Sequence, residues 1–75
     1  MAYSVGGAGQ RVSIRVYDLS GRMVRSLVND FQVAGHHRCE WDGRDESGQQ
    51  SRSGMYFIRV RVENEMRSVR VMFLQ

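Results

Sequence analysis

Short stretches in which apolar and polar residues alternate are the feature that most restricts the fold of this chain. In residues 11–18, RVSIRVYD, the apolar side chains of Val12, Ile14 and Val16 occupy every second position. Successive side chains of a β-strand point to opposite faces, so this period of two predicts a strand with one buried face. The chain has no proline and no helix-capping pattern, so we expect an all-β domain.

Further stretches of the same kind predict the remaining strands. Residues 22–29 are rich in β-branched residues and follow a tight turn, which favours a strand with a bulge over a helix turn. Residues 1–5, 36–41, 55–63 and 66–75 also alternate. Six or seven short strands in 75 residues predict one small antiparallel β-sandwich or barrel.

Aspartate and glycine mark the predicted turns, above all in DLSG (18–21) and WDGRDESG (41–48). Aspartate binds nearby backbone N–H groups and glycine adopts positive φ, so these residues are typical of turns. As a hypothesis, Asp42 and Asp45 accept hydrogen bonds from loop amides, and Arg44 pairs with an acid such as Asp18. The predicted structural turn residues are Asp18, Gly21, Asp42, Gly43, Asp45, Gly48 and Gly54.

The last two stretches predict a hairpin whose two faces differ. A turn centred between Asn64 and Glu65 would place Val60 opposite Val69, Ile58 opposite Val71 and Tyr56 opposite Phe73, on one apolar face. The predicted core therefore contains Val12, Ile14, Val16, Trp41, Tyr56, Ile58, Val60, Val69, Val71 and Phe73.

The opposite face of this hairpin is charged near the turn and apolar at its far end. The apolar end holds Met55, Phe57, Met72 and Leu74, which form our candidate interaction surface. Two alternatives stay open at this point. Either the first strand or the sheet edge covers these side chains, or they contact a neighbouring domain or a second copy of the chain.

Candidate metal ligands are weighed against simpler roles. Calcium takes six to eight oxygens, commonly from acids at every second position, and Asp42, Asp45 and Glu46 lack that spacing. His36 and His37 are adjacent, so a strand would point them to opposite faces. We therefore expect turn residues and no metal site, while weak calcium binding at the Asp42–Asp45 turn stays open.

Catalytic and sugar-binding roles are likewise disfavoured. Cys39 and His37 share a strand face and could form a nucleophile–base pair, but Trp41 is on the same face, which favours a small core residue at Cys39. Trp41 and Tyr56 could stack on a sugar, but at strand ends of a sandwich they are more often core residues. Tyr3 and Tyr17 are expected to be freer.

The composition further restricts which classes of partner and which covalent cross-links are possible. Every basic residue is arginine, and the 11 arginines are spread among eight acids, so we expect an ordinary charged surface and no nucleic-acid partner. The single cysteine excludes an intrachain disulfide. No apolar stretch approaches the roughly 18 residues that a membrane span requires.

Three segments, VYDLSGRMVRSLV, AGHHRCEWDGRDESG and SGMYFIRV, together resemble a known family. They are similar, in the same order, to the Ig-like domain of the flagellar hook-capping protein. They also resemble related C-terminal modules of secreted bacterial proteins, some of which are type IX secretion sorting domains. WDGRDESG with SGMYF is the most specific part. The sequence departs from the pattern where Gly6, Gly7 and Arg52 replace prolines, and where Arg67 or Arg70 replaces a lysine.

The resemblance implies a single Ig-like β-sandwich over residues 1–75, excised from the C-terminus of a larger secreted or envelope protein of a bacterium. It implies no catalytic residues, and together with the spacing of the acids and histidines it leads us to expect no metal and no cofactor. It also implies a function in assembly, anchoring or secretion through contacts with domains of the parent protein or through self-association. The alternative left open is a carbohydrate-binding module that uses exposed tyrosine and arginine residues.

Overall fold

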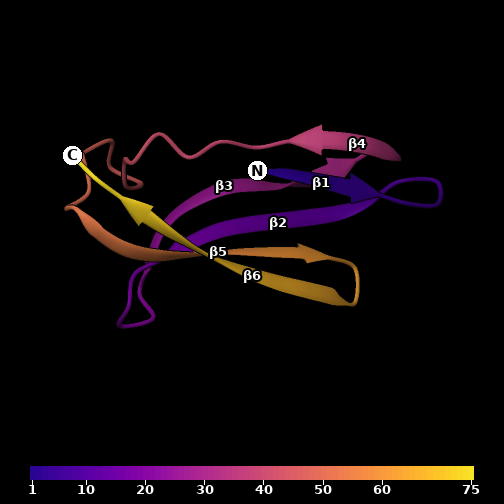
Figure 1. Ribbon diagram of the computed structural model, residues 1–75. Coiled ribbons are helices and arrows are strands. Elements are labelled where there is room, and N and C mark those ends of the chain that lie inside the picture. Colours follow the sequence, from indigo (N-terminus) through magenta and orange to yellow (C-terminus); the bar gives the residue numbers. More distant parts are fainter.

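The computed structural model describes residues 1–75 and contains six β-strands and no helix (Figure 1). The strands are β1 (Ala2–Val5), β2 (Gln10–Tyr17), β3 (Met23–Gln32), β4 (Gly35–Arg38), β5 (Gly54–Val62) and β6 (Glu65–Phe73). The structure therefore contains no membrane-spanning helix.

The six strands form two antiparallel sheets. A small sheet pairs β1 with β4, and a large sheet has the order β3-β2-β5-β6. In Figure 1 the small sheet lies above the large one, and the irregular segment after β4 continues along this upper layer before it descends to β5. The expected small antiparallel Ig-like β-sandwich of six to seven strands is confirmed.

The core lies between the two layers, on the face of the large sheet that we call the inner face. Its side chains come mainly from β2 and β5, where apolar residues alternate with exposed arginines. Val12, Ile14 and Val16 of β2 are completely buried, because β2 is a central strand with neighbours on both sides. The other buried core residues are Val5, Tyr56, Ile58 and Val60.

Strand β3 contains the irregularity that the sequence predicted for residues 22–29. The pairing with β2 shifts twice, so that Leu27 and Val24 are extra residues without a partner in β2. A bulge changes the direction of neighbouring side chains. Both residues are half-buried and pack against the core, together with Val28.

The register predicted for the last hairpin was wrong by two residues. The turn consists of Glu63 and Asn64, and Glu63 adopts a φ of 52°, so Val62 lies opposite Glu65. In the observed register Val60 faces Arg67, Ile58 faces Val69, Tyr56 faces Val71 and Gly54 faces Phe73. Because side chains alternate with a period of two, this shift leaves every residue on the predicted face.

Three further placements differ from the sequence-based expectations. Val69, expected in the core, is 37% exposed, because β6 is an edge strand with a neighbour on one side only. Gly54, expected in a turn, is the first residue of β5. The strand expected over residues 36–41 ends at Arg38. Trp41, Val71 and Phe73 are half-buried and pack against the core cluster.

Candidate interaction surface

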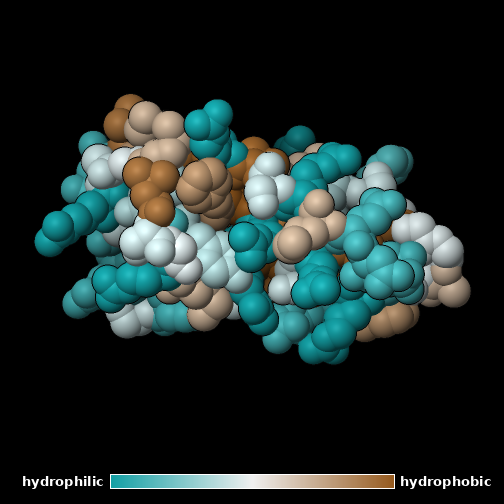
Figure 2. Space-filling view, turned by 90° about the horizontal axis from the view of Figure 1, so that it is seen from below, coloured by the Kyte–Doolittle hydropathy of each residue, from teal (hydrophilic) through white to brown (hydrophobic).

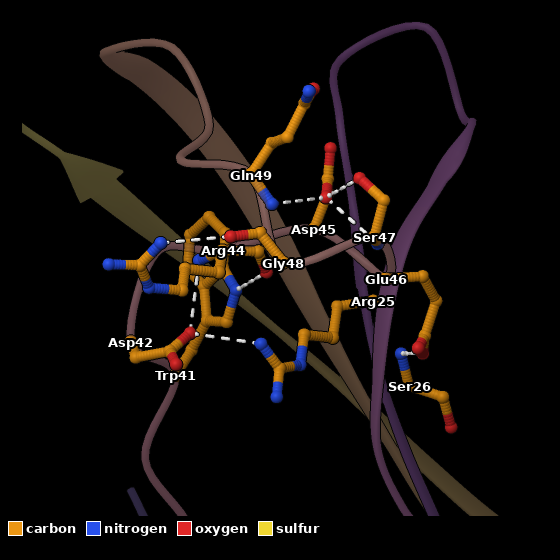
Figure 3. A network of polar contacts seen from close by, with 10 residues as sticks. All are labelled: Arg25, Ser26, Trp41, Asp42, Arg44, Asp45, Glu46, Ser47, Gly48 and Gln49. Atoms are coloured by element: carbon orange, nitrogen blue, oxygen red, sulfur yellow. Dashed lines mark hydrogen bonds and ion pairs between the residues drawn. The ribbon is translucent and has the colours of Figure 1, made fainter.

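The motif WDGRDESG lies in the irregular segment between β4 and β5, where its side chains mostly bind backbone groups of the same segment (Figure 3). The Trp41 indole donates a hydrogen bond to the Arg44 carbonyl at 2.9 Å. Its ring lies edge-on to Tyr56, with centroids 4.9 Å apart, and 5.2 Å from the ring centroid of Phe73. The aromatic residue of the motif therefore covers one end of the core.

Asp42 binds both its own loop and β3. Its Oδ1 accepts a hydrogen bond from the Arg44 N–H at 3.0 Å and forms an ion pair with Arg25 at 3.2 Å. The guanidinium of Arg44 donates to the Gly48 carbonyl at 2.8 Å, so the expected pairing of Arg44 with Asp18 was wrong. Asp18 instead accepts hydrogen bonds within its own turn.

Asp45 and Asp18 begin two turns of the same sequence, Asp-x-Ser-Gly, with the same hydrogen bonds. In each turn one carboxylate oxygen accepts from the serine N–H, the serine hydroxyl and the N–H four residues after the aspartate. The hydrogen bond from the serine hydroxyl is the main reason why the pKa of each of these two carboxyls lies below the ordinary value of 3.8. The repetition of D-x-S-G is the sequence signal that would have predicted this shared turn structure.

Glu46 attaches the second turn to the neighbouring strand. Its N–H donates to the Val24 carbonyl at 3.0 Å, and its Oε1 accepts from the Ser26 N–H at 2.8 Å. All three acids of the motif thus accept or exchange backbone hydrogen bonds. No three His, Cys, Asp or Glu side chains come together as a group that could hold a metal ion.

The histidines and the cysteine lie in or next to the small sheet. His36 Nδ1 is 3.0 Å from the Ser4 hydroxyl, whereas His37 Nε2 is 2.7 Å from the Val33 carbonyl and its ring stacks on Tyr3. Cys39 is half-buried against the core, and burial raises the pKa of its thiol. The thiol is therefore protonated at neutral pH, which makes it a poor nucleophile.

The hydroxyls or rings of the three tyrosines already contact other groups of the chain. The Tyr56 hydroxyl donates to the Arg52 carbonyl at 2.7 Å, and the Tyr3 hydroxyl donates to Gln32. Burial is the main reason why the pKa of Tyr3 is raised. Tyr17 faces outward, but the Arg59 guanidinium lies over its ring at 4.9 Å from the centroid. No tyrosine thus offers a bare ring for stacking.

The outer face of the large sheet, which points away from the small sheet, has an apolar half and a cationic half. Figure 2 shows this face, with apolar residues gathered toward its left end and hydrophilic residues over most of the right. We define the apolar patch by the outward side chains of four adjacent strands. It consists of Tyr17, Met23, Met55, Phe57 and Met72.

The four residues of the candidate interaction surface lie in or beside this patch. Met72 is 60% exposed, Leu74 directly after β6 is 74% exposed, and Met55 and Phe57 are half-buried beside their strand neighbours. The first strand does not cover them, because β1 pairs with β4 and contributes Val5 to the core on the opposite face.

Two antiparallel sheets without a helix, packed around a core from alternating strands, define a small immunoglobulin-like β-sandwich. The family profile of the FlgD Ig-like domain matches residues 2–65, and the chain therefore belongs to this family. This family is a structural, non-enzymatic module found in flagellar components, which are extracellular or associated with the envelope. Searches of curated proteins and of solved structures gave no significant match.

Proposed function

We propose that this domain is a non-catalytic accessory module at the C-terminus of a secreted or envelope protein of a bacterium. It acts in assembly, anchoring or secretion by contacting another protein domain through the outer face of its large sheet. The observation that carries the proposal is the apolar patch, which crosses all four strands and which the small sheet does not cover.

The register of the sheet explains why these side chains form one surface. Tyr17 of β2 lies between Met23 of β3 and Phe57 of β5, and Met55 lies directly opposite Met72. Contiguous apolar patches of a few hundred Å² on a soluble domain are typical of contact sites. Methionine side chains adapt readily to the shape of a partner, which suits such a contact.

A non-catalytic role is supported by how the reactive side chains are used. The carboxylates of the WDGRDESG motif bind backbone amides, and the histidines contact Ser4 and the Val33 carbonyl. The one thiol is half-buried and its pKa is raised. The Ser4 hydroxyl lies 3.0 Å from His36 Nδ1, but no third group binds the other ring nitrogen of His36 to orient it, as an activated serine–histidine pair requires.

Oxidation of Met72 by dilute peroxide tests the proposal. At 60% exposure, Met72 should react freely in this chain alone and several-fold more slowly in the complete protein that carries it. Phe57→Lys should abolish the protection in the complete protein. Val33→Lys, which alters an exposed residue outside the patch, should preserve it. Equal rates of Met72 oxidation in both proteins would contradict the proposal.

Light scattering on the chain alone separates two kinds of partner. A mass of 8.7 kDa at all concentrations excludes a second copy as the partner and favours a different domain. A mass that doubles with concentration in the native chain, but not in Phe57→Lys, means that a second copy covers it.

A further inference from the structure

The cationic half of the outer face gathers four arginines that are far apart in the sequence. Arg11 and Arg15 come from β2, Arg59 and Arg61 come from β5, and Arg15 lies directly opposite Arg59. All four are exposed and line a groove of about 510 Å³, which we call the arginine groove. Even spacing along the chain predicted dispersed charge, but the pairing of β2 with β5 brings these residues together.

Carboxylates within the chain do not neutralise this groove. The one ion pair of the structure joins Arg25 to Asp42, outside the groove. Arg11 donates to the Asn29 side chain at 3.2 Å, and the lining includes a single acid, Glu63, which pairs with none of the four arginines. Most acids are used elsewhere: Asp18, Asp30, Asp42, Asp45 and Glu46 accept backbone N–H groups.

The direct opposition of Arg15 and Arg59 opposes folding, because like charges in a cross-strand pair repel. The Tyr17 ring under Arg59 offsets part of this repulsion, and departures from local rules of this kind are expected at functional sites. Arginine is suited to such a site, since its planar guanidinium binds a carboxylate through two parallel hydrogen bonds.

The groove and the apolar patch are continuous. Tyr17 belongs to both, because its ring lies under Arg59 and its backbone pairs with Met23 and Phe57. A ligand that covers the whole face must therefore present negative charge beside apolar groups. A protein segment combines carboxylates with flexible apolar side chains that suit the methionines of the patch, whereas the backbone of a nucleic-acid duplex would match the arginines and leave the patch bare.

We propose that the arginine groove and the apolar patch together bind an acidic segment of a partner protein, in which carboxylate side chains lie next to apolar ones. This inference rests on the proposed function and specifies the chemistry of its partner. Arg15 and Arg59 bind the carboxylates, and Phe57 with Met72 contacts the apolar side chains.

The test uses a fluorescein-labelled peptide in which a run of glutamates is followed by leucine and phenylalanine, with anisotropy as the readout. A second peptide carries glutamine at each glutamate. The chain should bind the glutamate peptide more tightly than the glutamine peptide, and added salt should reduce the difference because it screens exposed charges.

Matched double variants locate the binding site. Arg15→Gln with Arg59→Gln should weaken binding of the glutamate peptide roughly 5- to 20-fold, the effect of losing two exposed ion pairs. Arg38→Gln with Arg52→Gln removes the same net charge outside the groove and should change the affinity less than about 2-fold. Circular dichroism checks that both variants retain the strands.

Three outcomes would overturn the inference. The first is equal affinity for the glutamate and glutamine peptides, and the second is an equal loss of affinity in the two double variants. The third is that a single-stranded oligonucleotide binds more tightly than the glutamate peptide and that Met72→Lys does not weaken its binding. Failure of the inference is distinguishable from failure of the proposed function. If only the inference fails, the arginine variants have no effect, but Met72 is still protected from peroxide in the complete protein.

Discussion

The two Asp-x-Ser-Gly turns have the same internal hydrogen bonds but different surroundings. The first joins β2 to β3, and the residue after its aspartate, Leu19, is 68% exposed. At the same position the second turn has Glu46, which exchanges two hydrogen bonds with β3. The aspartate, serine and glycine that both turns share therefore determine the shape of the turn, whereas the residue between aspartate and serine determines whether a side chain attaches the turn to the sheet.

The segment before the second turn strengthens this difference. Gly43 has a φ of 81° and is buried, and the ring of Phe73 lies so close that an added Cβ would be 2.3 Å from it. Gly21 and Gly48, the glycines of the two turns, also have positive φ but face open space. The long loop is thus fixed to the core by Gly43 and to β3 by Glu46.

The largest expected effect comes from Gly43→Ala. The substitution combines an unfavourable φ with overlap against Phe73, so it should lower the free energy of unfolding by roughly 2 to 5 kcal/mol. Gly21→Ala and Gly48→Ala should each cost about 1 to 2 kcal/mol, because only the backbone is strained. Urea denaturation measures all three, and equal costs would show that the contact with Phe73 has no energetic role.

The attachment to β3 is tested by Glu46→Ala. Loss of the carboxylate acceptor for the Ser26 N–H should reduce the free energy of unfolding by about 1 kcal/mol. Glu46→Gln retains an acceptor oxygen and should recover most of this loss. The equivalent change in the first turn, Leu19→Ala, should stay within about 0.5 kcal/mol. If Leu19→Ala destabilised the domain as much as Glu46→Ala, the two turns would be equally attached.

The smallest expected effect on stability comes from the hydrogen bonds to the aspartate carboxylate, which both turns have. Because the pKa of Asp18 and of Asp45 is lowered by folding, both carboxylates favour the folded state above the unfolded pKa, and this contribution disappears as the pH falls through the folded pKa. Asp18→Asn with Asp45→Asn should therefore flatten the acid limb of stability against pH. Carboxyl NMR titration should place both pKa values below 3.8 and close together. An ordinary pKa at either aspartate would show that the two turns do not stabilise their carboxylates in the same way.

The sequence predicted those features that depend on neighbouring residues. Alternation in β2 and β5 predicted which side chains face the core, and the faces survived the error in the last hairpin because the error was an even number of residues. Features that depend on long-range pairing were not predicted. The arginine groove exists only because β2 lies beside β5, and the exposure of Val69 follows from the edge position of β6.

In the WDGRDESG motif, too, local hydrogen bonds could be predicted from the sequence, whereas long-range partners could not. Its aspartates were expected to accept amide hydrogen bonds, and Asp42 and Asp45 do so. The partner of each charged side chain depended on the fold: Arg25, distant in the sequence, pairs with Asp42, while Arg44 binds a carbonyl of its own loop.

The small sheet contributes a single buried residue, Val5, to the core, and Cys39 next to it is joined to Met1 by two backbone hydrogen bonds of 2.8 and 2.9 Å. The other apolar side chains of this layer, among them Met1, Tyr3 and Cys39, are only half-buried, so the layer should separate from the large sheet more often than the whole domain unfolds. Each separation would expose the only thiol of the chain. Because Cys39 is already half-buried in the closed domain, the increase of its alkylation rate above a slow basal rate would report how often the small sheet separates.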